Sequence, residues 1–339
     1  MLDKDEAPET VFRALARAED LVSRLDERVA VCSWKAGFIG RIDFSEALAW
    51  GWLSGQIVTA EDLLLHDADM NARAPDQALS AVHAVVRGRR KAAAGGVELF
   101  SPQGAAWLVG LRRRPPAAGA VTIPPTWGQP AGEGPGMVKR LIGQLDALRA
   151  GETASVEAAL LDGLGLLDRT ARDAPVLLQA AAALEAWTLV SPLPRQAWVG
   201  PVLVGQWLRS RRRVTSHILG VVAGLRARKR GGREPAPDDP RARLTWWLKV
   251  IGAAADHGLE ELRRLELARQ VVEAAIGRRR SHSHLRAVLG LLLEQPLITA
   301  PLVAERLAVT PQTARRLIDE LGSSVIEISG RSRFRAWRL

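Results

Sequence analysis

The stretch Thr310-Pro-Gln-Thr-Ala-Arg-Arg-Leu-Ile-Asp-Glu-Leu-Gly322 decides the fold that we predict for the end of this chain. Thr310 can accept hydrogen bonds from the unpaired N–H groups of a first helical turn, and Pro311 stands where helices tolerate proline. Apolar residues recur at the spacing of one helical face, with polar and basic residues between them. The stretch therefore predicts an amphipathic helix, whose apolar stripe consists of Ala314, Leu317, Ile318 and Leu321.

A similar helix signal lies directly before this stretch. The segment Thr299-Ala-Pro-Leu-Val-Ala-Glu-Arg-Leu307 also begins with a capping threonine and an early proline. Only Ala308 and Val309 separate the two predicted helices, which leaves room for a tight turn. An apolar segment from His284 to Glu294 precedes them. This order of segments predicts a helix-turn-helix.

The last residues of the chain predict a β-hairpin. Val325–Ser329 and Phe334–Trp337 alternate between apolar and polar residues, and the turn Gly330-Arg-Ser-Arg333 joins them. Arg331 and Arg333 would lie at the tip of the hairpin, where basic side chains can contact phosphate. Helices followed by such a hairpin predict a winged helix-turn-helix.

The predicted winged helix-turn-helix suggests a set of DNA-contacting side chains. The second helix of this motif normally meets base edges, where arginine pairs with guanine and glutamine with adenine. Two alternatives stay open: a module that binds protein or dimerises, and a domain that keeps the shape without DNA binding. We predict contacts to double-stranded DNA from Thr310, Gln312, Thr313, Arg315, Arg316, Arg331, Arg333 and Arg335.

Composition favours a polyanionic partner. The chain has 339 residues, of which 47% are hydrophobic and 25% charged, and a net charge of +10. Nucleic acid is the commonest partner of such a basic protein. Between Arg209 and Arg233 the sequence has nine basic residues and no acidic one. This run predicts either a second surface that faces DNA or a solvated helix end.

Targeting signals point to the cytoplasm. The single cysteine, Cys32, excludes a disulfide within the chain and a cysteine-rich zinc site. The acidic N-terminus has no apolar signal core, and no apolar run is long enough to span a bilayer. We therefore expect a cytoplasmic protein without a membrane partner.

The fold class that we predict is all-α: a multi-helix body with a C-terminal winged helix-turn-helix, including a small β-hairpin. Prolines and glycines concentrate in one segment, which reads as a linker rather than a helix. The expected domains are an N-terminal helical domain at 1–114, a linker at 115–136, a central helical domain at 137–280 with a break near 231–240, and the winged helix-turn-helix at 281–339.

Within the body, glycines and caps suggest helix boundaries. A break at Gly37–Gly40 is expected before a helix at Phe44–Leu53, which Asp43 would cap. Asp76 would start a helix through Val86 that ends in the basic stretch Arg87–Lys91. The stretch Leu244–Ile276 is either one helix or two helices interrupted near Gly258.

Three segments resemble a family of bacterial, mostly alphaproteobacterial, proteins of unknown function with a C-terminal helix-turn-helix. The segments are Ala18-Glu-Asp-Leu21, Glu61-Asp-Leu-Leu-Leu-His-Asp-Ala68 and Gly330-Arg-Ser-Arg-Phe-Arg-Ala-Trp337. The resemblance covers nearly the whole chain. It implies an all-α body and a DNA-binding tail.

A more distant resemblance is to Fic-domain proteins, which transfer AMP. The segments that match in order are Glu46-Ala-Leu-Ala49, Gly55, Glu61-Asp-Leu-Leu64, Val121-Thr-Ile-Pro-Pro125 and Ala180–Leu189. The family motif His-Pro-Phe-x-x-Gly-Asn-Gly-Arg corresponds here to Ser191–Gly200, in which only Pro192 matches in place and Gly200 would be a relic. Serine cannot replace imidazole as a base, and no glycine-rich anion site remains. Ser54 also stands where the family has an inhibitory glutamate. The resemblance therefore implies a scaffold that has lost the reaction.

Metal sites and catalytic residues of other kinds have weak support in the sequence. His66-Asp67 is typical of metal-dependent phosphohydrolases, but His83 and Asp69 are the only further ligand types nearby. Ser281-His-Ser-His284 places its histidines two residues apart, which on a helix turns them away from each other. We predict no catalytic residue, no metal and no cofactor.

These observations predict a sequence-specific DNA-binding protein that acts as a transcriptional or plasmid-maintenance regulator. The helical body would serve dimerisation, in a homodimer, or the sensing of a partner. The alternatives are a divergent Fic-like nucleotidyltransferase and a helix-turn-helix interaction scaffold without catalysis.

Overall fold

The structure is a computed structural model in which two compact units can be distinguished. One unit comprises residues 1–27 and 87–257, and the other comprises 28–86 and 258–339. Three helices, α1 (Glu6–Ala30), α4 (Gln77–Ala94) and α11 (Pro240–Ile276), contribute residues to both units. The structure describes residues 6–70, 74–100, 102–110, 174–190, 193–230, 239–277, 282–330 and 335–339.

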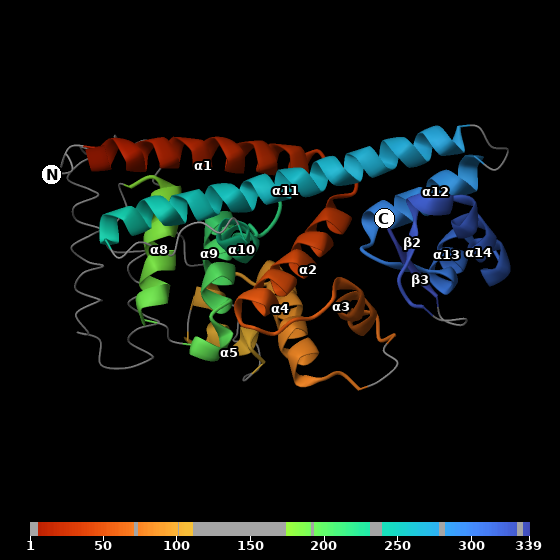
Figure 1. Ribbon diagram of the computed structural model, residues 1–339, viewed down its shortest axis with the longest axis horizontal. Helices are drawn as coiled ribbons and strands as arrows, with labels where there is room; N and C mark the ends of the chain where they lie inside the picture. Colours follow the sequence, from red (N-terminus) through yellow and green to blue (C-terminus); the bar gives the residue numbers. More distant parts are fainter. Residues whose placement is uncertain are drawn as a thin grey trace. The chain divides into compact units, whose positions relative to one another are not determined.

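The second unit ends in a winged helix-turn-helix (Figure 1). Its helices are α12 (His282–Glu294), α13 (Ala300–Leu307) and α14 (Pro311–Glu320). Its strands are β1 (Ile298–Thr299), β2 (Ile326–Glu327) and β3 (Ala336–Arg338), and a short 3-10 turn, η3 (Gly322–Ser324), joins α14 to β2. The predicted fold class, all-α with a terminal winged helix-turn-helix, is confirmed.

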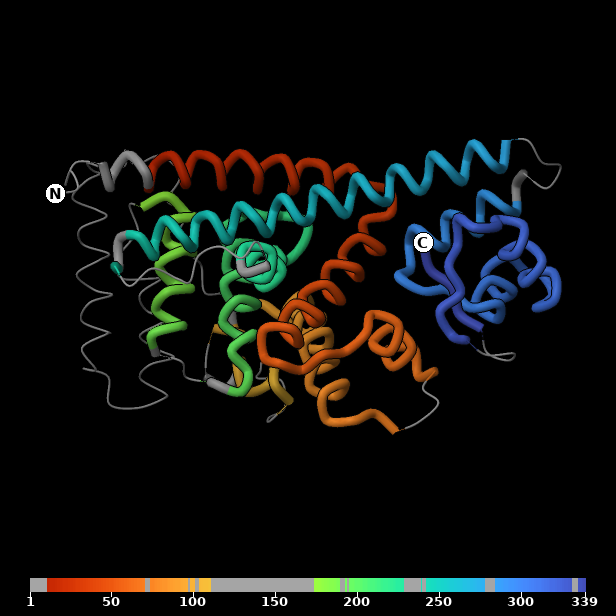
Figure 2. Tube along the Cα trace, in the orientation of Figure 1, coloured from red at the N-terminus to blue at the C-terminus, as the bar shows by residue number. Residues whose placement is uncertain are grey.

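The strands form a small antiparallel sheet in the order β1-β3-β2. Ile326 pairs with Arg338 and Glu327 with Trp337, so the predicted hairpin is confirmed. Strand β1 was not predicted. Its Ile298 pairs with Trp337 on the other edge of β3, and this pairing ties the hairpin to the start of α13. In Figure 2 the segment from α12 to the C-terminus is drawn in blue.

One hydrophobic core holds the winged helix together. It draws apolar residues from all three helices and from β3, and Ala314, Leu317 and Ile318 of α14 are buried in it, as the apolar stripe predicts. The core also takes Leu265 and Val272 from α11. Burial of side chains from segments far apart in the sequence stabilises the arrangement of these helices.

Helix α2 (Lys35–Leu53) shows that the predicted break at Gly37–Gly40 is wrong. The helix runs through both glycines, and the predicted cap, Asp43, is a buried residue inside it. A Cβ atom on Gly37 would lie 1.8 Å from the carbonyl oxygen of Leu293, and one on Gly40 would lie 2.9 Å from the side chain of Pro296. The glycines therefore permit close helix packing instead of ending the helix.

One other helix end differs from the prediction, and the structure decides between the two alternatives for Leu244–Ile276. Asp76 caps α4 through a 2.7 Å hydrogen bond from the N–H of Leu79, as predicted, but the helix continues through the basic segment to Ala94. It continues because Arg89 is buried and donates to the carbonyl of Ile218, at 2.8 Å. Helix α11 is one helix, and Gly258 does not interrupt it.

The remaining helices of the first unit are short and largely buried. They are α5 (Pro102–Leu108), α8 (Val176–Val190), α9 (Val199–Ser210) and α10 (Val221–Arg230), with the 3-10 turns η1 (Val97–Phe100) and η2 (Pro194–Gln196). Helix α3 (Ala60–Asp67) belongs to the second unit. In the first unit, Glu185 accepts hydrogen bonds from Arg243, at 2.7 Å, and from Trp247, at 2.9 Å. The carboxylate is buried, so these partners fix the start of α11 against α8.

Several expectations fall on residues outside the described ranges. They concern the linker at 115–136, the whole of the segment 137–173, the break at 231–238, and Ser191 and Pro192. The two compact units follow packing rather than sequence order, and the predicted division into three domains and a linker stays a prediction.

Candidate nucleic-acid interface

Local hydrogen bonds start both helices of the helix-turn-helix where the sequence predicts. The Thr299 hydroxyl accepts from the N–H of Leu302, at 3.3 Å, and the Thr310 hydroxyl accepts from the N–H of Thr313, at 3.1 Å. Between the helices Ala308 adopts a left-handed conformation with φ of 52°. This conformation reverses the chain within two residues, so α13 and α14 can pack together.

The exposed face of α14 carries the predicted base-reading residues. Gln312, Arg315 and Arg316 are exposed, whereas Ala314 between them is buried. The core residues of the helix therefore fix the direction in which these polar side chains point. Thr310 and Thr313 lie at the start of the helix, and their hydroxyls are 2.9 Å apart. The capping bond uses one lone pair of the Thr310 hydroxyl oxygen, and Thr310 as a whole is exposed.

Charge is distributed unevenly along α14. The basic residues Arg315 and Arg316 lie in its middle, and the acidic residues Asp319 and Glu320 lie in its last turn. Arg316 Nε is 3.6 Å from Glu320 Oε1, but the Arg316 side chain is 71% exposed. A pair this exposed holds an arginine only weakly, so Arg316 can turn toward a phosphate or a base.

The base of the wing is held by a glutamate. Glu327 accepts a hydrogen bond from the Ser329 hydroxyl, from the N–H of Gly330 at 3.1 Å and from Arg335 at 3.2 Å. The bond from Ser329, with help from Arg335, holds the pKa of Glu327 below its ordinary value. The Arg335 guanidinium also lies 5.2 Å from the ring centre of Trp337. Arg335, predicted to contact DNA, thus already has partners within the wing, while Arg331 and Arg333 lie outside the described residues.

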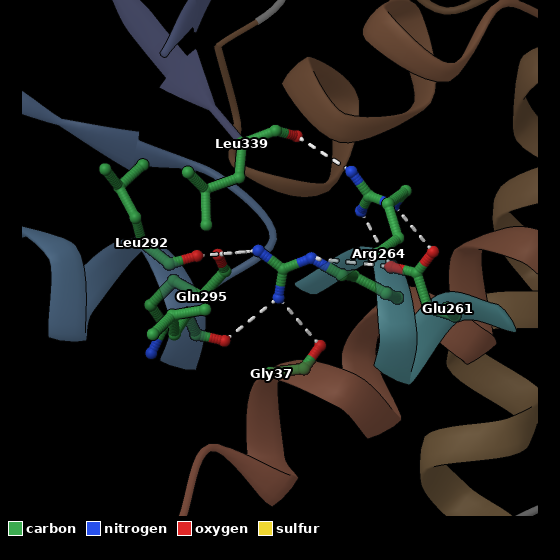
Figure 3. Close-up of polar contacts among 8 residues, drawn as sticks. Gly37, Glu261, Arg264, Leu292, Gln295 and Leu339 are labelled. Atoms are coloured by element: carbon green, nitrogen blue, oxygen red, sulfur yellow. Dashed lines mark hydrogen bonds and ion pairs between the residues drawn. The ribbon is translucent and has the colours of Figure 1, made fainter. Parts of the chain in front are cut away.

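The winged helix is joined to α2 by a buried arginine that the sequence analysis missed. The Arg41 guanidinium donates to four backbone carbonyls: that of Gly37 on its own helix, and those of Leu292, Leu293 and Gln295 at the end of α12, at distances of 2.6–3.0 Å (Figure 3). Carbonyls at a helix end lack partners within the helix and carry partial negative charge. Arg41 therefore caps α12 from a neighbouring helix.

Burial and neighbouring charges change the pKa of Arg41. Burial lowers the pKa of Arg41 to about 10, and the carboxylate of Glu261, 3.9 Å away, offsets part of this effect. Glu261 also pairs with Arg264, whose guanidinium reaches the carbonyl of Leu339 at 3.4 Å (Figure 3). The end of α12 and the end of β3 are thus both bonded to side chains of other helices. No sequence signal distinguishes Arg41 from the many surface arginines.

Three arginines in the first half of the basic run make contacts within the first unit. Arg213 donates to Glu19 at 2.6 Å and to the Ser23 hydroxyl at 2.9 Å. Arg209 donates to the Gln206 side chain at 3.0 Å, and Arg211 lies over the ring of Trp207. A second DNA-facing surface along 209–233 stays a prediction. Arg209, Arg211 and Arg213, in the first half of this run, already contact other residues of the protein.

Two further sequence candidates have packing explanations. Asp67 and His83 form a hydrogen bond of 2.8 Å, and the His83 ring lies edge-on to that of His66. The described residues contain no group of three or more side chains arranged to hold a metal ion. A Cβ atom on Gly200 would lie 2.4 Å from the Trp187 ring, so this glycine lets α8 and α9 pack closely.

Comparison with known proteins places the chain in a family. It is 33% identical to the uncharacterized protein y4cF of Sinorhizobium fredii, and the match covers 93% of each chain. The chain belongs to the family of that protein. Residues 155–277 also match a model described as a protein of unknown function, DUF1612. The predicted resemblance to such a family is confirmed, whereas a relationship to Fic-domain proteins is not shown and stays a prediction.

Residues 285–339 match a model described as an HTH DNA binding domain. The match covers α13, α14, the sheet and nearly all of α12. The chain therefore carries a helix-turn-helix DNA-binding domain. In the part of the chain that the structure describes, no helix combines the length and the apolar character needed to cross a membrane.

Proposed function

We propose that the protein is a sequence-specific DNA-binding protein that regulates transcription or plasmid maintenance. The observation that carries the proposal is the face of α14. Gln312, Arg315 and Arg316 are exposed over a buried stripe in a helix whose start is fixed by Thr310. Side chains held in this way can be inserted into a major groove as a rigid set.

The arginine-rich composition supports the same proposal. Contacts between arginine and phosphate release counterions, so the affinity for DNA is expected to fall steeply as the salt concentration rises. Arg331 and Arg333 are proposed to supply such contacts from the wing. Arg335 is proposed to contribute less, because it pairs with Glu327.

Homodimerisation is part of the proposal. Regulators of this class commonly bind two half-sites through the two-fold symmetry of a dimer. Sedimentation of the full chain, free and with selected DNA, tests this point. A single protomer on a non-palindromic site would contradict it.

The decisive experiment is selection of bound DNA from a random library with the full chain. The expected result is a discrete enriched motif, bound at least about a hundredfold more tightly than a scrambled sequence at physiological salt. Binding without any enriched motif would contradict sequence specificity. No binding even at low salt would contradict the DNA-binding role and would favour an interaction scaffold.

A further inference from the structure

The second half of α11 has two faces with different surroundings. On one face, Leu265, Val272 and Ile276 are buried in the core of the winged helix. Figure 1 shows the winged helix on one side of this part of α11. The opposite face carries Leu267 and Val271, which are 61% and 53% exposed. An apolar residue belongs on a face that is covered, so the exposed face is a candidate contact surface.

The exposed apolar residues have the spacing of a helix-pairing seam. Leu267, Val271 and Ala274 are separated by four and then by three residues, as in the seam of a coiled coil. All three residues are exposed, and so are Gln270 and Ala275 beside them. We call Leu267, Val271 and Ala274 the α11 stripe. Because α11 also has its buried face, it is apolar on two sides, which a helix with one solvated side is not.

Other segments of the second unit contact the sides of α11 and leave the stripe exposed. At the end of α1, Arg28 donates two hydrogen bonds to Glu266, at 2.7 and 2.9 Å. The Arg269 guanidinium lies 5.5 Å from the ring centre of Trp34, in the segment that follows α1. These contacts fix α11 within the second unit. The stripe is therefore presented on a helix that is held in place from its other sides.

Charge decides in which direction a second copy can pair with the stripe. Arg263 is exposed one turn before Leu267, and α11 ends at Ile276, soon after the stripe. A parallel pairing would bring the Arg263 side chains of two copies together, which is unfavourable. An antiparallel pairing brings Arg263 to the C-terminal end of the partner helix, whose carbonyls carry partial negative charge. The stripe is thus complementary to itself in the antiparallel direction.

We propose that the α11 stripe is a homodimer interface, on which a second copy of this chain packs with the two α11 helices antiparallel. Leu267 of one protomer would contact Val271 of its partner, and the two copies of Gln270 would lie close to the two-fold axis. Such an interface uses the same surface on both copies, as closed dimers do. The inference rests on the homodimer of the proposed function and names the surface that forms it.

The position of the stripe links dimerisation to DNA binding. One face of α11 packs into the winged-helix core, and the opposite face would pack against the partner. The same helix would therefore hold the two copies of α14 at a fixed separation. A fixed separation sets the spacing of two half-sites in DNA. The stripe is short, so we expect a weak dimer that binding to two half-sites strengthens.

Sedimentation of the full chain without DNA, from about 1 to about 100 µM, tests the interface. We expect a monomer–dimer equilibrium with a Kd of about 10 µM. Leu267→Glu should raise this Kd at least about tenfold, because it places a carboxylate against Val271 of the partner. The matched control is Ile57→Glu, since Ile57 is 85% exposed and lies outside α11. Circular dichroism checks that each variant is folded.

Engineered cysteines test the antiparallel direction. Cys32→Ser removes the single cysteine of the chain, and Gln270→Cys then places one thiol of each copy near the two-fold axis. A short bis-maleimide should cross-link this variant into a dimer. The control is Glu260→Cys, which is exposed on the same face of α11. Antiparallel pairing separates its two copies by about 27 Å along the helix, so no cross-link is expected.

The outcomes separate this inference from the proposed function. A monomer at every concentration would overturn the interface, as would equal weakening by Ile57→Glu. A dimer that Leu267→Glu leaves unchanged would move dimerisation to another surface and also overturn it. A cross-link through Glu260→Cys would contradict the antiparallel pairing. Neither measurement contains DNA, so a failure of α14 to bind DNA would leave both results unchanged.

Discussion

The arginines of α14 and those of the basic run in the first unit have contrasting surroundings. On α14, Arg315 and Arg316 are exposed, and Arg316 has one weak ion pair at 3.6 Å. In the first unit, Arg213 has three hydrogen bonds to α1. The comparison teaches that a basic run in a sequence does not identify a nucleic-acid surface. The number of partners that the fold supplies decides whether an arginine is available to a ligand.

Arg41 is the extreme case of an arginine held by the fold, and its removal should have the largest effect. Arg41→Ala would leave three carbonyls at the end of α12 without this donor, so we expect the free energy of unfolding to fall by about 3 kcal/mol. Arg41→Lys should recover only part of it, because lysine lacks the planar fork. Urea denaturation of both variants measures this. Wild-type stability of Arg41→Ala would contradict the cap.

The exposed face of α14 should show the opposite behaviour. Gln312→Ala and Arg316→Ala should relax sequence choice, each costing about 1–3 kcal/mol at a specific base, without unfolding the domain. Competition between the selected site and single-base variants of it measures this loss. Arg306→Ala, on the exposed surface of α13, is the control. Equal losses on specific and scrambled DNA would show that α14 does not read bases.

Arg213 and Arg315 give a matched pair for the comparison itself. Arg213→Ala should lower stability by about 1 kcal/mol and leave DNA affinity unchanged, because its side chain is engaged with Glu19. Arg315→Ala should leave stability unchanged and weaken DNA binding. Thermal unfolding and DNA titration of the same two preparations separate these effects. A weaker DNA complex with Arg213→Ala would restore the basic run as a DNA surface.

The turn between α13 and α14 should tolerate glycine better than alanine. Ala308 has a positive φ, which glycine adopts without steric cost. Ala308→Gly should raise the free energy of unfolding by up to about 1 kcal/mol. The control is Ala304→Gly, within α13, which should lower it because glycine weakens a helix interior. Lower stability of Ala308→Gly would mean that the turn relaxes in solution.

The smallest expected effect concerns Glu327 in the wing. Because its pKa in the folded protein lies below the ordinary value, the ionised carboxylate stabilises the fold above the unfolded pKa. That contribution is lost as the pH falls through the folded pKa. Glu327→Gln should therefore be less stable than the wild type at neutral pH, and the difference should disappear in acid. A difference that stays constant with pH would contradict the role of the charge.

Features that depend on neighbouring residues could be predicted from the sequence. Thr299 and Thr310 cap helices as expected, because a cap needs only the N–H groups of the next turn. The burial of Leu317 and Ile318 follows from helical periodicity. Strand β1 was missed because it has two residues and exists only through its pairing with β3. The expected break at Gly37 was wrong because close packing, not a turn, requires that glycine.

The sequence by itself determined the order of helices, the hairpin and the polar face of α14, since caps, periodicity and turns act over a few residues. Only the tertiary structure decided which arginines are held in place, because their partners are remote. Arg41 and Gln295 are 254 positions apart, and Arg213 and Glu19 are 194 apart. Such contacts have no local pattern, and only the folded chain brings their members together.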